Sequence, residues 1–476
     1  MAETVTALGV KLALMGAICA TAACASLPPR QPARIARAPN DLASAESFSA
    51  VVAPWPGDGW WKDYGDAQLT GLIDTALAGS PSLAQAEARL RRADAALAGR
   101  RGEGLPDLAV TGEVVEEKRS YNNGFPRQFL PQGYNDYGRA NFDFSWELDF
   151  WGRNRAAVAA AASEARAAEA DAAQARLMLT TSIAASYADL AGLFARRDVA
   201  ERALTLRSET LRLVQMRVDN GLDTRAELSQ AESGPSAARA AIAAIDEDIA
   251  IVRNRLAALA GQGPDRGLAI ARPSAATLRP LGLPESLAAN LLGRRPDLAA
   301  ARWRAEAAQR RVKGAKAAFY PNINLVGELG VQALHLDHLL DAGSDAGQVG
   351  PAVSLPIFRG GRLRAGLRGA EAERDEAVAA YDDVLTNAMR DVADAVASQR
   401  SLSVRLAQSR QALAAGEDAL RIARLRYQGA LTTYQSALLA EEAVLDRRRA
   451  VADLEARAFV LDVALIRALG GGYRGS

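Results

Sequence analysis

The chain contains few of the residues on which enzymes and metal proteins depend. Among its 476 residues there are only two cysteines, Cys19 and Cys24, and two histidines. It has no phosphate-binding loop, nucleophile elbow or histidine-based metalloprotease motif, so we expect neither an enzyme nor a bound cofactor. The formal net charge is only +1, which argues against nucleic acid as a partner. No uninterrupted apolar run of about 20 residues is present, so no transmembrane helix is expected.

The two histidines lie close together in the second half of the chain. His335 and His338 flank Asp337, and His and Asp side chains one helical turn apart could bind a metal ion. A solvated loop between two strands explains the same residues equally simply. We favour the loop and predict no metal site.

The N-terminus resembles a bacterial export signal. An apolar run, Leu12–Ala20, is followed by small residues and then by Cys24, as in a lipobox whose cysteine is acylated with fatty acids such as palmitate. We therefore predict a signal peptide at 1–23 and a lipid-anchored segment at 24–66. The alternative is an ordinary signal peptide in which the cysteine is incidental. Cys19 would leave with the signal, so the mature chain would have no internal disulfide.

Most of the remaining chain is one unit used twice. A shift of 215 residues sets Pro106 on Pro321, and a shift of 209 sets Gly152 on Gly361 and continues without a gap. Self-similarity on this scale indicates one supersecondary unit that is repeated. The predicted organisation is a first repeat at 67–270, a linker at 271–286 and a second repeat at 287–476.

Each repeat contains two strands of alternating polarity. The pattern is clearest at Arg139–Phe150, where apolar residues alternate with polar ones, so that the strand has one lipid face and could cross a bilayer when tilted. The other strands are expected near Leu105–Glu117, 322–331 and 349–357. Four strands cannot close a barrel, because small barrels need about eight, and open edges are not tolerated in lipid. The chain is therefore predicted to oligomerise.

A very long helix follows the strands in each repeat. Neither Arg153–Asn220 nor Arg362–Gln428 contains a proline, and a helix of this length would extend roughly 100 Å. Hydrophobic residues seven apart, such as Leu420 and Tyr427, predict a coiled-coil seam. Each long helix ends at a tight turn that leads into a return helix, and Pro235 predicts a kink in the first return helix.

Several short motifs occur in a characteristic order. They are Trp60-Trp61, Ser145–Arg153, Arg295–Leu298, Ala315–Pro321, Leu355–Arg362 and Ala468–Gly472. In order and spacing they resemble the outer membrane factor family, the TolC-like export ducts, and especially its lipoprotein branch, the NodT type. This resemblance implies an α+β membrane protein, in which three protomers with four strands each form a 12-stranded outer-membrane β-barrel. The barrel would continue into a long periplasmic α-helical barrel.

The resemblance also implies a function. The chain would be the outer-membrane exit duct of a tripartite efflux system of the resistance-nodulation-division type. It would passively conduct drugs or other small toxic compounds from an inner-membrane pump and a periplasmic adaptor. One alternative is a copper or silver efflux duct of the same family. Another is a lipid-anchored trimeric coiled-coil stalk without a conduit, although a stalk has no use for strands with a lipid face.

The expected gate departs from the family pattern. Family members often place two aspartates just after the second turn, but Ser436 and Leu439 occupy those positions here, and Glu227 and Gln230 match them in the first repeat. An aspartate ring is therefore not expected, and the alternatives for the constriction are Asp223, Glu227, Tyr434 and Glu441. The residues expected at the periplasmic aperture and the adaptor docking site are Asp223, Thr224, Glu227, Thr433, Tyr434, Ser436 and Leu439.

Overall fold

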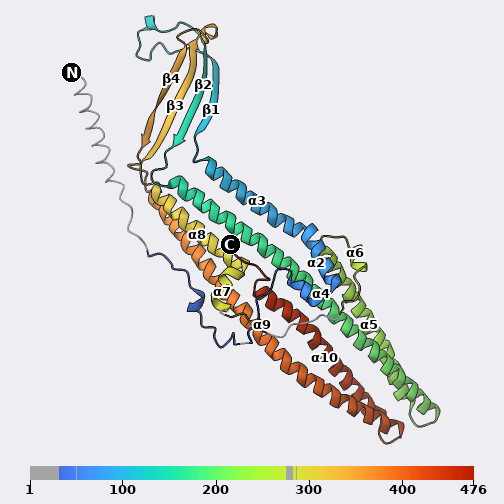
Figure 1. Cartoon of the computed structure of the whole chain (residues 1–476). Helices are drawn as coiled ribbons and strands as arrows, with labels where there is room; N and C mark the ends of the chain where they lie inside the picture. Colours follow the sequence, from blue (N-terminus) through green and yellow to red (C-terminus); the bar gives the residue numbers. More distant parts are fainter. Residues whose placement is uncertain (1–31, 50, 275–281, 286, 476) are drawn as a thin grey trace. The chain divides into compact units, whose positions relative to one another are not determined.

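The computed structural model describes residues 32–49, 51–274, 282–285 and 287–475. The predicted signal peptide and Cys24 lie outside the described residues. The helices and strands follow one another as η2 (Pro39–Asp41), η3 (Trp60–Tyr64), α2 (Ala67–Gly79), α3 (Pro81–Gly102), β1 (Asp107–Glu117), η4 (Arg127–Phe129), β2 (Asn135–Glu147), α4 (Arg153–Asp219), α5 (Arg225–Leu259), α6 (Asp265–Leu268), α7 (Leu287–Arg294), α8 (Pro296–Ala317), β3 (Asn322–Leu334), η5 (Leu336–His338), β4 (Asp345–Ser354), α9 (Arg362–Gln428) and α10 (Tyr434–Ala468) (Figure 1).

Two compact units can be distinguished, and each draws on both halves of the sequence. The first contains 91–167 and 302–380, and the second contains 36–90, 168–301 and 381–476. The strands belong to the first unit, and the helical turns that end α4 and α9 belong to the second. Segments that correspond in the sequence therefore pack together rather than forming one unit for each half.

The four strands that the alternation predicts form a single antiparallel sheet in the order β1-β2-β3-β4. Several strand bounds differ from the prediction: β1 begins two residues later, β2 and β4 each begin four residues earlier, β3 extends three residues further, and β2 and β4 each end three residues earlier. β2 ends at Glu147, three residues before Phe150, because the Asp149 carboxylate accepts a hydrogen bond from the backbone N–H of Arg155 at 2.8 Å and begins α4. β4 ends at Ser354, and Pro356 keeps the next residues out of the sheet, since proline cannot donate to a strand ladder.

One face of the sheet carries apolar side chains that are exposed in the protomer. They include Leu108, Val110, Val114, Phe142, Leu329, Val349 and Val353. The other face is polar and bonded across the strands: Thr111 donates to Asp143 at 2.6 Å, and Gln348 donates to Glu328 at 3.2 Å. This two-faced sheet agrees with the predicted lipid and polar sides.

The helices of the two repeats match in length. α4 and α9 have 67 residues each, and α5 and α10 have 35 each, as the sequence correspondence predicts. α5 continues through Pro235, so the proline does not end it. Within the described residues, α4 is also long and apolar enough to cross a membrane, but 61% of its most apolar window is buried inside the structure. That burial is typical of a helix that packs in a core.

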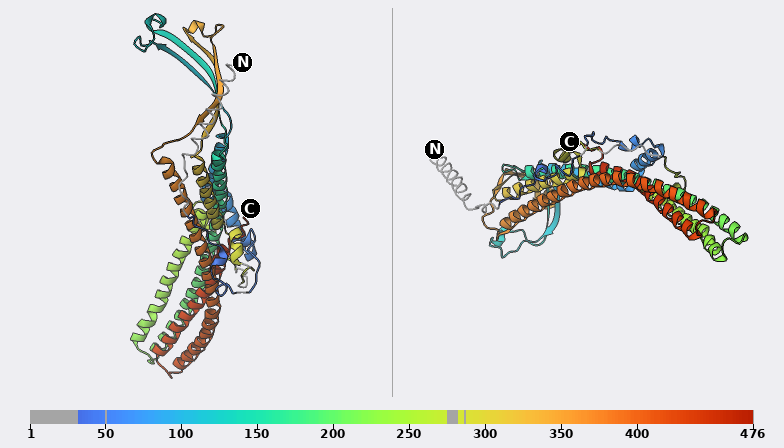
Figure 2. Two further views of the ribbon diagram at one scale, coloured as in Figure 1. Left: turned by 90° about the vertical axis from the view of Figure 1, so that its left-hand side faces the viewer. Right: turned by 90° about the horizontal axis from the view of Figure 1, so that it is seen from below.

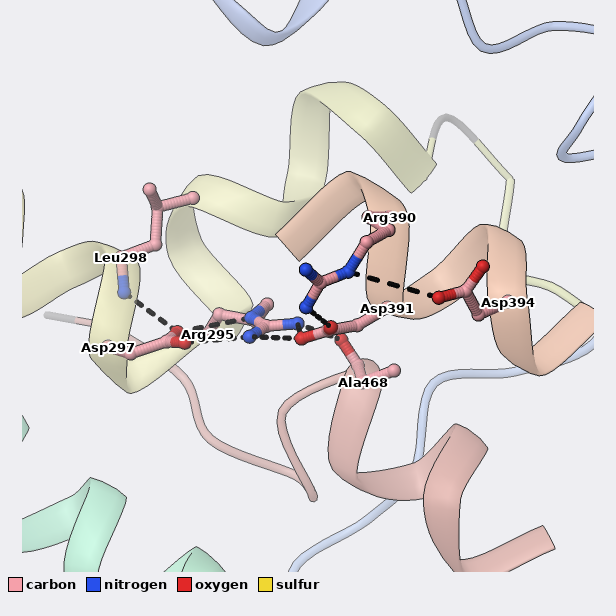
Figure 3. Close-up of polar contacts among 7 residues, drawn as sticks. All are labelled: Arg295, Asp297, Leu298, Arg390, Asp391, Asp394 and Ala468. Carbon is pink, nitrogen blue, oxygen red and sulfur yellow. Dashed lines mark hydrogen bonds and ion pairs between the residues drawn. The ribbon is translucent and has the colours of Figure 1, made fainter. Parts of the chain in front are cut away.

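The second unit is held together at the α7–α8 junction by Arg295, whose side chain is buried. Its guanidinium lies 2.7 Å from the Asp297 carboxylate and 3.2 Å from that of Asp391 in α9, and it donates to the Ala468 carbonyl of α10 at 3.1 Å (Figure 3). Burial alone would lower the pKa of Arg295, but the two carboxylates outweigh it and raise the pKa. The Arg295–Leu298 motif therefore fixes three helices at one point.

Candidate functional site: the two helical turns

The candidate site comprises the turn between α4 and α5 and the turn between α9 and α10, which lie next to each other at one end of these helices (Figure 2). Both long helices end with the same hydrogen bonds. Leu222 N–H donates to the Arg217 carbonyl, and Leu431 N–H donates to the Arg426 carbonyl, each at 2.8 Å. This pattern requires a left-handed residue just past the helix. Gly221 fills that position in the first turn with φ 71°, and Ala430 fills it in the second with φ 57°.

Asp223, in the first turn, is the centre of a buried polar cluster. Its carboxylate faces the guanidinium of Arg217, with Nε–Oδ2 at 2.9 Å and Nη2–Oδ1 at 3.3 Å. Only 7% of the Asp223 side chain and 9% of the Arg217 side chain are exposed. The hydroxyl of Tyr427, in α9, also donates to Asp223. The carboxylate therefore links the first helical hairpin to the second.

Arg217 makes two further contacts between the first helical hairpin and Tyr427 of the second. It donates to the backbone carbonyl of Tyr427 at 2.8 Å, and its guanidinium carbon lies 4.5 Å from the centre of the Tyr427 ring. Hydrogen bonding to Asp223 raises the pKa of Arg217, while burial and donation to Asp223 raise that of Tyr427. Both side chains thus keep the protons with which they donate to their partners. A small apolar cluster that contains Val214 and Tyr434 surrounds this pair.

A second buried link joins α4 to α10. The Glu441 carboxylate accepts a hydrogen bond from the Thr210 hydroxyl at 2.7 Å, and the residue is only 2% exposed. Burial raises the pKa of Glu441 in spite of this hydrogen bond. Glu441 is therefore part of the packing between these helices within the protomer.

The other predicted residues divide into helix caps and exposed side chains. Thr224 precedes α5, and its backbone N–H and hydroxyl both donate to the Glu227 carboxylate, at 2.6 Å and 2.8 Å. Thr433 precedes α10, and its hydroxyl lies 3.3 Å from that of Ser436. Tyr434 is buried, whereas Leu439 is exposed. The tips of the two turns also expose a matched pair of leucines, Leu222 and Leu431.

The sequence pattern does not point to Arg217 or Tyr427 as residues of this site. Tyr427 stands in the heptad pattern, which predicts a place in a coiled-coil seam. Arg217 matches Arg426 of the second repeat, but Arg426 is exposed and makes no comparable contact among the described residues. The sequence feature that points to Arg217 is weak: a charged residue stands close to a helix end, six residues before an aspartate.

The histidines do not converge on a metal site. His335 pairs with Asp136 at 3.0 Å, while His338 pairs with Asp341 at 2.7 Å. In the described part of the chain, no group of three or more His, Cys, Asp or Glu side chains could hold a metal ion. Both histidines lie at the end of the β3–β4 hairpin, in the loop that the sequence indicated.

The fold defines a class of protein. A sheet with one exposed apolar face and two open edges can cross a membrane only when copies join to close it. Very long helical hairpins that leave such a sheet are typical of outer-membrane export channels. The model of the family described as "Outer membrane efflux protein" matches residues 72–262 and 287–471. The chain belongs to this outer membrane efflux protein family.

Known proteins agree with this assignment over most of their length. The fusaric acid resistance protein FusA of Burkholderia cepacia is 37% identical, over 76% of this chain and 69% of its own. The multidrug resistance outer membrane protein MdtP of Shigella flexneri is 30% identical, over 92% of this chain and 91% of its own. The crystal structure of the outer membrane protein VceC of Vibrio cholerae is 46% identical, covers 88% of this chain and 100% of its own, and superposes with a TM-score of 0.84.

The family assignment completes the fold. The protein is a trimeric outer-membrane efflux channel, in which each protomer contributes four strands to a 12-stranded barrel that continues into a helical barrel. The predicted family, fold class and exit-duct function are confirmed. The two open edges of the protomer sheet are closed by neighbouring protomers, which is the physical reason that the chain must oligomerise.

Proposed function

We propose that the channel conducts small organic toxic compounds, including drugs, out of the cell, and that it has no catalytic activity or cofactor of its own. The names of two relatives support this cargo, since one confers resistance to fusaric acid and the other to multiple drugs. A periplasmic adaptor and an inner-membrane pump would deliver the cargo. The repeats at 67–270 and 287–476 would each provide two strands and one helical hairpin.

The two turns would form the periplasmic mouth of the duct and keep it closed at rest. The observation that supports this is the buried link from Asp223 to Arg217 and Tyr427, which ties the tips of both hairpins together. Separating the tips would break the hydrogen bonds from the Tyr427 hydroxyl to Asp223 and from Arg217 to the Tyr427 carbonyl, while Arg217 and Asp223 would stay paired within the first turn. A hydrogen bond to a charged group contributes about 1.5–3 kcal/mol. An adaptor that binds the tips could compensate for that cost.

The link can be tested by single-channel conductance in planar bilayers. Tyr427→Phe keeps the ring over Arg217 but removes the hydroxyl that reaches Asp223, and Asp223→Asn removes the negative charge. Both variants should open more often than the wild type and should increase antibiotic entry into cells at an unchanged protein level. The matched control is Tyr320→Phe, which lies outside the turns. Unchanged conductance in both variants would place the constriction elsewhere.

The adaptor would dock on the outside of the tips. Thr224, Glu227, Thr433 and Ser436 lie at the starts of the return helices, and the exposed leucines Leu222, Leu431 and Leu439 offer apolar contacts beside them. Leu222→Asp with Leu431→Asp should reduce cross-linking to the adaptor without reducing the amount of trimer. If the double variant still cross-links and still confers resistance, the adaptor does not dock on these leucines.

The mature protein would also carry a lipid anchor on Cys24, after removal of residues 1–23. The small residues before the cysteine support this proposal. Mass spectrometry of the mature N-terminus should find an acylated Cys24. A mature chain that begins at another residue, or carries no fatty acid, would disprove the anchor.

A further inference from the structure

The two places where a strand passes into a long helix correspond in sequence but differ in charge. A shift of 209 residues sets the first junction, 147–155, on the second, 356–364. Both contain arginines at the start of the helix, since Arg153 and Arg155 match Arg362 and Arg364. The acidic residues that lie beside the arginines of the first junction have no acidic counterpart at the second junction.

At the first junction, both arginines are neutralised locally. Arg153 pairs with Glu147 at 2.5 Å, and Arg155 lies 3.4 Å from the Asp149 carboxylate, which also accepts the Arg155 backbone N–H. These acids precede the arginines by six residues in each case. Because each arginine there already has a carboxylate partner, its attraction for an external anion is reduced.

At the second junction, Pro356 and Phe358 stand where Glu147 and Asp149 stand in the first. Arg359, Arg362 and Arg364 are exposed, and none of them forms an ion pair with any residue that the structure describes. The adjacent Phe358 is 87% exposed, although a phenylalanine gains from burial. Three free cations therefore lie beside an exposed aromatic ring.

A small cavity of about 230 Å³ lies at these junctions. It is lined by Arg359 and Arg362 of the second junction and by Arg153, Glu147 and Asp149 of the first, where Glu147 neutralises Arg153. Two aromatic residues form part of its wall. Trp151 stacks on Tyr320 with ring centres 4.7 Å apart, and its indole N–H donates to the Pro321 carbonyl at 2.8 Å. The cavity is thus preformed: Arg359 and Arg362 are the lining charges without an ion-pair partner among the described residues, and two stacked aromatic rings form part of its wall.

We propose that this junction binds the phosphate headgroup of an anionic phospholipid in the periplasmic leaflet of the outer membrane. The strands end here and the periplasmic helices begin, so the junction lies where the barrel leaves the bilayer. Amphipathic aromatic rings are typical of this level of a membrane protein, and guanidinium groups bind phosphate through paired hydrogen bonds. The exposed Phe358 and Ile357 would contact the acyl chains, which favours a lipid over free phosphate.

The proposal can be tested on the purified trimer by native mass spectrometry in detergent. The probes are phosphatidylglycerol, phosphatidylcholine with the same acyl chains, and inorganic phosphate. The wild type should retain phosphatidylglycerol in preference to both others. Arg359→Ser with Arg362→Ser should weaken that binding, by about fivefold for each arginine. Phe358→Asp, which restores the acid of the first junction, should also weaken it.

The matched control is Arg400→Ser, which removes an exposed arginine further along α9 and should leave lipid binding unchanged. Equal retention of phosphatidylglycerol and phosphatidylcholine, or equal loss in the control, would overturn the proposal. Binding of inorganic phosphate alone would overturn the assignment to a lipid. If the double variant dissociates into monomers in lipid-free detergent, these arginines are contacts between protomers, and the proposal is wrong.

Discussion

Ala430 adopts a backbone conformation that glycine accepts more easily. Its φ of 57° is left-handed, and the matching residue of the first turn is Gly221. A side chain in this conformation costs about 1 kcal/mol. We therefore expect Ala430→Gly to raise the thermal unfolding midpoint of the purified trimer and Gly221→Ala to lower it. No atom lies within 4 Å of a Cβ built on Gly221. The stability lost in Gly221→Ala would therefore come from the backbone conformation and not from a steric clash. Shifts of the same sign would contradict this account.

Glu441 makes stability at the turns depend on pH. Burial raises its pKa above the ordinary value of 4.5, so the folded protein holds a proton that the unfolded chain releases. The wild type should therefore lose stability as the pH rises from about 4.5 through the raised folded pKa. Glu441→Gln keeps the shape without the charge and should show a flatter profile of unfolding midpoint against pH. A profile as steep as that of the wild type would assign the dependence to another group.

The helices pack closely at one glycine. A Cβ on Gly192 of α4 would lie 2.8 Å from the Cβ of Ala456 in α10. Gly192→Ala should force these helices apart and cost about 1–3 kcal/mol, although alanine favours a helix. In Gly366→Ala the new Cβ meets nothing within 4 Å, so the change should instead gain about 1 kcal/mol. Thermal unfolding of both trimers compares the two effects, and a stabilised Gly192→Ala would show that the contact can relax.

Element lengths and faces followed from local patterns. The matched long helices, the four strands and their apolar face were predicted from spacing and alternation, because these depend on neighbours within a few residues. Strand ends were less accurate. Asp149 and Pro356 decide where the sheet stops, one by capping a helix and the other by removing a donor. The alternation of apolar and polar side chains carries no information about the helix cap or the missing donor.

The assembled channel depends on the apolar face of the sheet. Phe142 is 56% exposed in the protomer and lies on the apolar face of the sheet, which we expect to contact lipid in the trimer. Phe142→Arg should lower the yield of membrane-inserted trimer, since arginine near the bilayer midplane costs about 2–4 kcal/mol. Gln348→Arg, on the polar face, is the control and should assemble normally. Trimer yield can be read from heat-modifiable migration on gels, and the opposite result would reverse the two faces.

The repeat, the element order, the two-faced strands and the need for oligomers all follow from the amino-acid sequence. These properties arise from residues that are neighbours in the chain, and a repeated pattern makes them visible twice. The contacts between side chains that are distant in the sequence are seen in the tertiary structure alone. Tyr427 reaches Asp223 across 204 residues, and Arg295 reaches Asp391 across 96. Such pairs depend on how helices pack in space, so no spacing within the chain could identify them.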